Sequence, residues 1–443
     1  MRQSVPATKR NPPLWRVSLF IKETPTLLGD FCVISCMKRL WLILSVLILF
    51  LFNSCDNFND EIKNPPPRDL TAAEKLLVNS DNAFGLKLFQ ALNKADPDSN
   101  TLISPLSISM ALGMTLNGAA DSTYEAMKNT LELAGFSETD INEAYQSLIE
   151  LLENLDPEVI FNIANSIWYR EGLPVYEDFI KINQTYFDAE VRELDFTDPK
   201  AVDIINNWVS DKTNELIKKI IEQIPDHMVM YLINAIYFKG NWRYPFDPKK
   251  TENGIFHNHD GTRSTMSMMT REFSVPMYIN SEAAIVDLPY GDSLFSMTIF
   301  LPKENINDFV SNLTPSKLTN WIEQLQSNRF YLTMPRFELE YEKKLNDILA
   351  ALGMSIAFDK WQANFSRIMP IGGGINLYIS EVKHKTFIKV DEEGTEAAAV
   401  TSVGIGNTSM PPSIIINQPF VFAIRENHSK TILFIGKILN LVE

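Results

Sequence analysis

The chain has 443 residues, 45% of them hydrophobic, which is enough for one large domain or for two or three of ordinary size. Its formal net charge is −15, from 55 acidic and 40 basic residues, and a chain this acidic is a poor binder of nucleic acid backbones. All three cysteines lie in the first 55 residues, so the rest of the chain has no internal disulfide, cysteine metal site or thiol nucleophile.

The N-terminal part of the chain has the pattern of an export signal. Residues 1–36 resemble no targeting signal, and we expect them to be untranslated or unstructured, with translation starting at Met37. A short basic start there is followed by an apolar run, residues 40–52, which is too short for a comfortable transmembrane span of about 20 residues. We therefore predict that residues 37–54 are a signal peptide.

Cys55 directly follows the small residue Ser54, an arrangement that resembles a bacterial lipobox. The resemblance implies that Cys55 is the lipidated first residue of the mature chain, although Phe52 and Asn53 depart from the usual Leu and small residue. The alternative is an ordinary secretory signal. Residues 55–70 are polar and include three successive prolines, which predicts a flexible tether. We expect an exported bacterial lipoprotein, at the outer membrane or cell surface, and otherwise a secreted protein.

Residues 71–443 contain no linker-like break, low-complexity tract or internal repeat, which predicts one domain. In its first half, apolar residues recur at helical spacing in residues 74–93, 104–116, 144–155 and 201–222. The second half is rich in Ile, Phe, Tyr and Met, which predicts strands over residues 229–238, 284–288, 296–301, 330–335 and 432–439. This distribution favours a mixed α+β domain.

Several segments resemble the serpins, a family of protease inhibitors, in the family's order and at its spacing. They include residues 100–112, 205–213, 234–242, 287–290, 296–302, 334–337, 382–400 and 418–425. The resemblance covers essentially all of residues 71–443. It implies the serpin fold, in which three β-sheets are surrounded by about eight to nine helices and a reactive-centre loop is exposed. It also implies a monomer that needs no cofactor.

The hinge of that loop has a composition that suits insertion into a sheet. The hinge residues are Glu392, Glu393, Gly394, Thr395, Glu396, Ala397, Ala398 and Ala399. Alternate residues from Thr395 to Ile405 are uncharged and small or β-branched, whereas the other set contains one charge, Glu396. Because a strand places alternate side chains on opposite faces, the first set would be buried and Glu396 would face water. Without the resemblance, a flexible loop or a helix start would be an equal alternative.

The resemblance implies a suicide-substrate mechanism. A protease cleaves the loop and forms an acyl-enzyme, and the freed strand then inserts and traps the protease covalently. Alignment places the cleaved bond at Thr408-Ser409, with Asn407-Thr408 as the runner-up. Residues 397–416 contain no Lys, Arg or aromatic residue, so we expect elastase-like or subtilisin-like targets. Cysteine proteases are also possible targets.

Two further groups of residues match positions that serve insertion in serpins. The first group lies where the central sheet parts and comprises Ser104, Ser107, Asn234 and His384. The second group lies where insertion begins and comprises Trp242, Arg336 and Glu392. We expect an ion pair between Arg336 and Glu392. The alternative for both groups is plain core packing and surface pairing.

Other classes of function have less support. The sequence has no nucleophile-elbow, zinc-protease, phosphate-binding or dinucleotide-binding motif, and its five histidines form no metal-ligand pattern. We therefore expect neither an enzyme nor a metal site. The remaining alternative to an inhibitor is a non-inhibitory serpin that acts as a binding protein.

Overall fold

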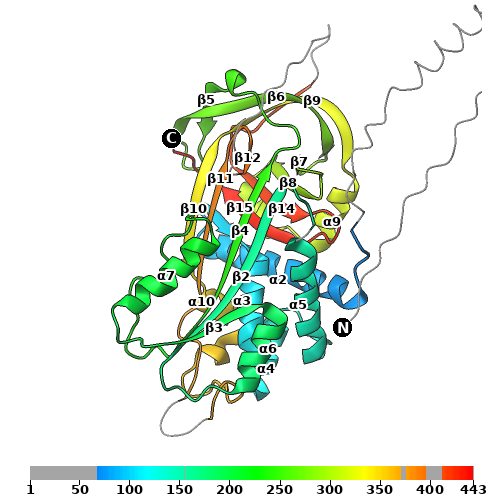
Figure 1. The fold of residues 1–443 in the computed structure, drawn as a ribbon. Coiled ribbons are helices and arrows are strands. Elements are labelled where there is room, and N and C mark those ends of the chain that lie inside the picture. Colours follow the sequence, from blue (N-terminus) through cyan, green and yellow to red (C-terminus); the bar gives the residue numbers. More distant parts are fainter. Residues whose placement is uncertain (1–66, 154, 371–375, 396–411, 443) are drawn as a thin grey trace, which may run out of the picture. The chain divides into compact units, whose positions relative to one another are not determined.

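The computed structural model describes residues 67–153, 155–370, 376–395 and 412–442 (Figure 1). The chain divides into two units, residues 1–65 and residues 66–443, and the fold reported below is that of the second unit. The predicted start at Met37, the signal peptide over residues 37–54 and the lipidation site at Cys55 all lie outside the described residues.

The described residues contain nine α-helices, most of them in the first half of the chain. They are α2 (Ala72–Ala95), α3 (Pro105–Leu116), α4 (Asp121–Thr130), α5 (Glu138–Glu153), α6 (Glu177–Phe187), α7 (Lys200–Lys212), α8 (Ile306–Ser311), α9 (Pro315–Glu323) and α10 (Asn346–Leu349). Local sequence explains where α3 begins, because the Ser104 side chain accepts a hydrogen bond from the Ser107 backbone N–H and Pro105 occupies the first turn.

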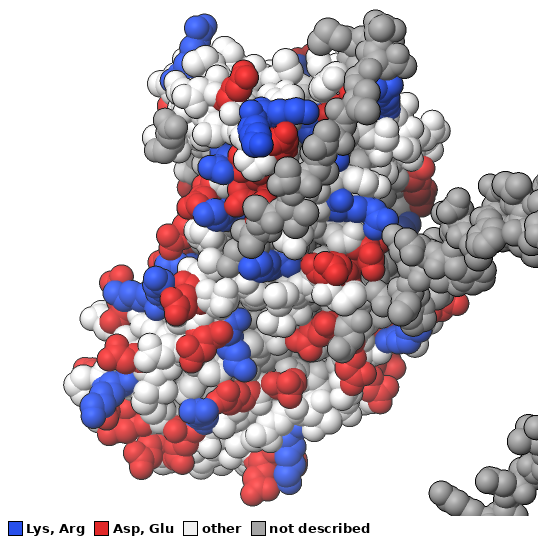
Figure 2. All heavy atoms as spheres, turned by 45° about the horizontal axis from the view of Figure 1, so that its top comes forward, with Lys and Arg blue, Asp and Glu red and all other residues white. Residues whose placement is uncertain are grey.

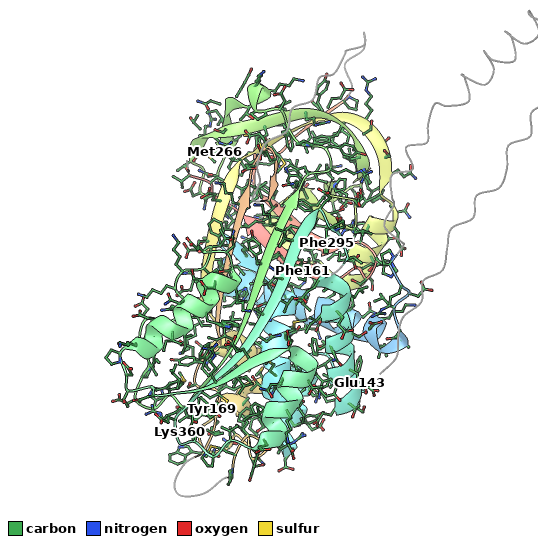
Figure 3. The ribbon with its side chains drawn as sticks, viewed as in Figure 1. Glu143, Phe161, Tyr169, Met266, Phe295 and Lys360 are labelled. Atoms are coloured by element: carbon green, nitrogen blue, oxygen red, sulfur yellow. The ribbon has the colours of Figure 1, made fainter. Side chains whose placement is uncertain are left out.

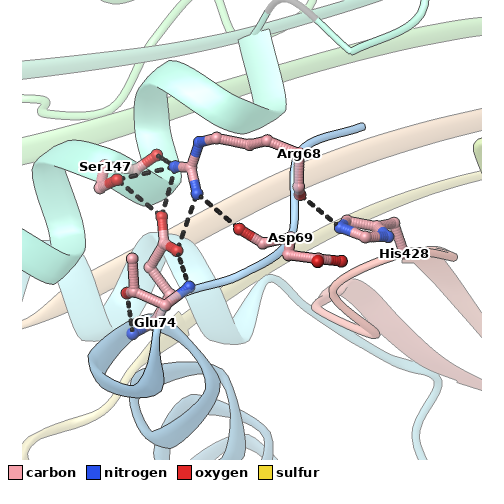
Figure 4. A network of polar contacts seen from close by, with 6 residues as sticks. Arg68, Asp69, Glu74, Ser147 and His428 are labelled. Atoms are coloured by element: carbon pink, nitrogen blue, oxygen red, sulfur yellow. Dashed lines mark hydrogen bonds and ion pairs between the residues drawn. The ribbon is translucent and has the colours of Figure 1, made fainter. Parts of the chain in front are cut away.

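The start of α2 is fixed by a polar network that also reaches α5 (Figure 4). Thr71 and Glu74 form a reciprocal capping box. Arg68 donates to both carboxylate oxygens of Glu74 and to Ser147 Oγ of α5, while its carbonyl oxygen lies 2.7 Å from Nε2 of His428. The hydrogen bond from Arg68 lowers the pKa of Glu74 to about 2. This network attaches the segment before α2 to the domain.

Among the described residues, the larger sheet has nine strands, and hydrogen bonds join each strand to its neighbours. Along the sheet the order is β1 (Thr101–Ile103), β15 (Ile432–Ile438), β14 (Phe420–Glu426), β8 (Phe295–Pro302), β7 (Ala283–Tyr290), β6 (Arg263–Ile279), β9 (Gln326–Pro335) and β13 (Ser413–Ile415), and β5 (Glu252–His257) also pairs with β6. Because the 17-residue β6 reaches β5, β7 and β9, it joins both halves into one sheet.

The smaller sheet has six strands in the part of the chain that the structure describes. Its order is β10 (Phe337–Lys344), β11 (Lys383–Val390), β12 (Gly394–Thr395), β4 (Met230–Asn241), β2 (Val159–Arg170) and β3 (Ala189–Leu194). The long β2 and β4 lie side by side in Figure 1 and pair along eleven residues, from Val159 opposite Gly240 to Tyr169 opposite Met230.

The main hydrophobic core lies between the two sheets and the helices. Phe161 of β2 packs against Phe295 of β8, with ring centroids 6.1 Å apart, and Figure 3 shows the two labelled side by side. A second, smaller cluster lies on the opposite face of β2 and β4 from α3 and includes Trp168 and Trp208, the latter from α7. On the face seen in Figure 2, acidic and basic side chains are interspersed.

The sequence predicted most of these elements. The resemblance implied three β-sheets, and hydrogen bonding joins the described strands into two, because β6 pairs with strands of both halves of the larger sheet. One predicted helix differs clearly from the structure. The predicted helix over residues 201–222 ends at Lys212. Asn214 and Glu215 have positive φ angles of 49° and 63°, so the chain leaves the helix there. The Asn206 side chain then accepts hydrogen bonds from the backbone of Ile220 and Ile221. The apolar residues beyond Lys212 are buried as expected, but in a non-helical segment, because burial alone does not require a helix.

Candidate functional site

The six-stranded sheet is interrupted between β4 and β11. In the part of the chain that the structure describes, these two strands have no register with each other. The two-residue strand β12 alone lies between them, at one end, whereas β4 has 12 residues and β11 has eight. At β12 these two strands lie one strand apart, and beyond it their facing edges, which border what we call the gap, make no backbone pairing with each other among the described residues.

The hinge of the predicted loop begins this missing strand. Gly394 pairs with Asn241 and Thr395 pairs with Gly240, both antiparallel, and Thr395 is also opposite Val390 of β11. Thr395 is 3% exposed, so its side chain faces the core. Position 394 requires glycine, because a Cβ there would lie 2.1 Å from the carbonyl oxygen of Gly240.

The residues just before β12 are held by polar contacts. The Trp242 indole N–H donates to the carbonyl oxygen of Asp391 at 2.9 Å, and its backbone N–H donates to the carbonyl oxygen of Glu393 at 2.7 Å. Arg336 forms an ion pair with Glu392 at 2.5 Å, as expected from the sequence, and the Thr251 hydroxyl donates to the same carboxylate. Burial alone would raise the pKa of Glu392, but these two partners hold it below its usual value.

A cavity of about 410 Å³ lies at the other end of the gap, and residues of α3, β4 and β11 contribute to its lining. Asn234 and His384 both line it from opposite sides of the gap. The Asn234 side-chain amide donates to Asn165, and its side-chain carbonyl oxygen has no hydrogen-bond partner among the described residues. The Nε2 atom of His384 accepts a hydrogen bond from the Ser104 backbone N–H at 3.1 Å, so the ring hydrogen of the neutral imidazole lies on Nδ1. Burial lowers the pKa of His384 to about 3.

The structure thus brings the predicted residues together in two places. The first place is the end of the gap where β12 lies, which we call the head of the gap, and it contains Trp242, Arg336, Glu392, Glu393, Gly394 and Thr395. The second place is along the gap, and it contains Ser104, Ser107, Asn234 and His384. Their roles in insertion stay predictions. The other predicted loop residues lie outside the described residues: Glu396, Ala397, Ala398, Ala399, Asn407, Thr408 and Ser409.

Sequence reasoning missed two contacts at the head of the gap. Thr251 carries no local signal for its contact with Glu392. Tyr290 makes a hydrogen bond with Thr395. The resemblance over residues 287–290 includes Tyr290 but does not indicate this contact. Among the described residues, no group of three or more His, Cys, Asp or Glu could hold a metal ion, and no helix is long and apolar enough to cross a membrane.

Comparisons with known proteins agree with this architecture. The model of a family described as serpin (serine protease inhibitor) matches residues 79–441. Serpin A3-2 of Bos taurus is 32% identical over 370 residues, which cover 82% of this chain and 89% of the bovine protein. Serpin B8 of Homo sapiens is 33% identical over 373 residues, which cover 82% and 98% of the two chains.

Solved structures are similar over the same part of the chain. Native tengpin, a thermophilic serpin, is 36% identical with a TM-score of 0.77, over 87% of this chain and 99% of tengpin. Human thyroxine-binding globulin, solved as a complex with thyroxine, is 28% identical with a TM-score of 0.77, over 84% of this chain and 100% of that one.

The chain belongs to the serpin family. It has the α+β serpin fold. Members of this family are in general protease inhibitors and not catalytic enzymes, and their partners are proteases.

Proposed function

We propose that this serpin is an inhibitor that traps proteases by inserting its cleaved loop into the gap between β4 and β11. The observation that carries the proposal is the position of β12: the hinge already forms the first two residues of the strand that the gap lacks. A chain cleaved beyond this hinge would complete the sheet by continuing the same register, because unpaired strand edges favour the addition of a strand.

The register of β12 predicts which loop residue meets the polar groups in the gap. Thr395 is opposite Gly240 and Val390. Six residues further along an antiparallel strand, Thr401 falls opposite Asn234 on β4 and His384 on β11. Since six is an even number, the side chain of Thr401 faces the core, as that of Thr395 does.

A hydroxyl group at this position would satisfy both strands. The Thr401 hydroxyl can donate a hydrogen bond to the side-chain carbonyl oxygen of Asn234, which has no partner among the described residues. The oxygen of that hydroxyl can in turn accept a hydrogen bond from the Nδ1–H of His384. Buried polar groups without partners cost about 1–3 kcal/mol each, so these two bonds would favour the inserted state. The match is specific to a residue that both donates and accepts.

The length and composition of the loop agree with this mechanism. Residues 394–408 would form a strand of about 50 Å at about 3.3 Å per residue. The residues that would face the core are small or β-branched, and Glu396 would face away from it. Insertion would release free energy stored in the incomplete sheet, which a kinetic barrier retains until cleavage.

The cleaved bond is proposed to be Thr408-Ser409, with Asn407-Thr408 as the alternative. Because the loop offers neither a cation nor a large ring, elastase-like and subtilisin-like proteases are the proposed targets, and papain-like enzymes are a second class to test.

The deciding experiment incubates the protein with elastase, subtilisin, trypsin and a papain-like protease, followed by SDS gel electrophoresis and mass spectrometry of the released peptide. We expect an SDS-stable complex with elastase or subtilisin. Thr401→Val removes only the hydroxyl and should reduce trapping, whereas Ser402→Ala, on the opposite face, should not. Cleavage without any complex would favour a binding protein, the kind of role suggested by the thyroxine in the thyroxine-binding globulin structure.

We also propose export as a lipoprotein anchored through Cys55, on the basis of the lipobox-like sequence. In a bacterial host, the Cys55→Ser variant should leave the membrane fraction and appear in the soluble fraction. If the variant fractionates as the original does, the anchor assignment is wrong.

A further inference from the structure

A hydrogen bond connects the hinge to the other sheet. The Tyr290 hydroxyl, at the end of β7 in the nine-stranded sheet, lies 2.7 Å from Oγ1 of Thr395 in the six-stranded sheet. Both residues are buried, with exposed fractions of 0% and 3%. We infer that Tyr290 is a positioning residue, which holds the hinge at the head of the gap before the loop is cleaved. This inference rests on the proposed inhibitory function and names a residue on which that function depends.

The ring of Tyr290 is fixed by its neighbours. It stacks on the ring of Trp242, with centroids 4.4 Å apart and planes inclined by 12°, and it contacts Phe238 edge to face at 5.1 Å. Gly240 makes room for it, because a Cβ there would lie 2.9 Å from Tyr290 Cδ1. A ring held in this way keeps its hydroxyl directed at the position that Thr395 occupies.

The hydroxyl depends on Thr395 for its hydrogen bond. No other partner of Tyr290 Oη occurs among the described residues. Burial raises the pKa of Tyr290 well above its usual value, so the group stays protonated and needs an acceptor or donor beside it. If the hinge left the sheet, Tyr290 would lose that partner in a buried site, which is unfavourable.

The stacked ring also connects Tyr290 to the rest of the hinge. Trp242 covers Tyr290 with its ring and binds the backbone of Asp391 and Glu393 with its two N–H groups. Tyr290 and Trp242 therefore hold the hinge from both ends of the segment from Asp391 to Thr395. We expect insertion after cleavage to begin from this paired position and to proceed away from it.

The test uses three variants of the full chain: Tyr290→Phe, Thr395→Val and the double variant. The two single changes keep the shape of the side chain, and each leaves the partner hydroxyl buried and unpaired. The double change removes both hydroxyls, so that no polar group is left without a partner. Tyr169→Phe, at the far end of β2, is the matched control.

Two measurements separate this inference from the proposed function. Hydrogen exchange of the backbone over residues 391–395 reports whether the hinge stays in the sheet, and it does not require any protease to be inhibited. We expect exchange to become about fivefold faster in each single variant, to return toward the original rate in the double variant and to be unchanged in the control. Unchanged exchange in Tyr290→Phe would overturn the inference.

The second measurement is the number of inhibitor molecules consumed per protease trapped. We expect it to rise about twofold to fivefold in each single variant and to recover in the double variant. If the original chain traps no protease while exchange responds as expected, the inhibitory function fails and the holding contact stands. If trapping occurs but Tyr290→Phe leaves both measurements unchanged, Tyr290 has no positioning role.

Discussion

The two sheets of this serpin differ in completeness. Each neighbour in the nine-stranded sheet is joined by hydrogen bonds, and that sheet includes strands such as β14 whose residues are all buried. The six-stranded sheet contains the gap between β4 and β11, bridged by two residues at one end. If insertion occurs as proposed, the free energy that it releases is stored in the six-stranded sheet, which would gain hydrogen bonds by accepting a further strand, whereas neighbouring strands of the nine-stranded sheet are already paired.

The strongest way to break this comparison is to prevent the gap from being filled. Thr395→Arg would place a long charged side chain beside Tyr290 in the core, which costs several kcal/mol. We expect trapping to be lost, with the number of inhibitor molecules consumed per protease rising more than about tenfold. Gel analysis of complex against cleaved protein measures this ratio. The control is Glu396→Arg, since alternation predicts that residue 396 faces away from the core. Equal loss in both variants would contradict the proposed geometry.

The comparison becomes sharper if filling the gap raises stability. Cleavage of the loop should raise the apparent melting temperature by more than about 10 °C, because the inserted strand adds backbone hydrogen bonds and buried side chains to the sheet. Calorimetry of the intact and the cleaved protein tests this, with an active-site-blocked protease as the control. An unchanged melting temperature would mean that the gap stays empty after cleavage.

A mutation in the nine-stranded sheet should lower stability without affecting trapping. Ile299→Ala, at a fully buried position of β8, should lower the free energy of unfolding by about 2–5 kcal/mol and leave the ratio of trapped to cleaved protein unchanged. Ile279→Ala, at a position 52% exposed, should change the free energy by less than about 0.5 kcal/mol. Urea unfolding and the gel assay together test whether stability and trapping separate in this way.

Acid should act on the incomplete sheet through His384. Burial keeps the folded pKa at about 3, below the value of about 6.5 in an unfolded chain, so the unfolded state binds the proton first as pH falls. This contribution to stability is present above pH 6.5 and is lost between about pH 6.5 and pH 3, with about 2 kcal/mol lost at pH 5. Urea unfolding at pH 7 and pH 5 measures it. The His384→Gln variant retains a side-chain acceptor and should lose this part of the pH dependence.

The smallest expected effect is at the ion pair beside the hinge. Arg336 is about half exposed, so Arg336→Gln should weaken the hinge by less than about 1 kcal/mol and raise the number of inhibitor molecules consumed about twofold. Arg329→Gln removes another Arg–Glu pair, on β9 and away from the gap, and should have no effect on trapping. A larger effect of Arg329 than of Arg336 would contradict the proposed role of the head of the gap.

The sequence predicted the features that depend on local pattern. Helical spacing located α2 and α3, and apolar runs located β4, β7 and β8. The ion pair between Arg336 and Glu392 was expected from the resemblance to serpins, which placed both residues where insertion begins, and the structure shows it. The end of α7 was wrong because two residues with positive φ turn the chain while apolar periodicity continues.

The gap itself could not be predicted from local pattern. Residues of β4 and β11 have similar strand-forming sequences, and only long-range pairing decides whether they meet. The contact of Tyr290 with Thr395 joins residues 105 positions apart, and neither residue has a neighbour in the sequence that indicates the other. Such contacts depend on the order of the strands in the sheets, and the periodicity of apolar residues does not determine that order.

The polar network around Arg68 has a consequence for where the protein works. If Cys55 carries the lipid that we propose, 13 Cα-to-Cα steps separate the anchor from the first fixed point of the domain (68 − 55 = 13). Fully extended, they span about 45 Å. The domain would thus stay close to the membrane, and a protease would meet this inhibitor only after approaching the cell surface.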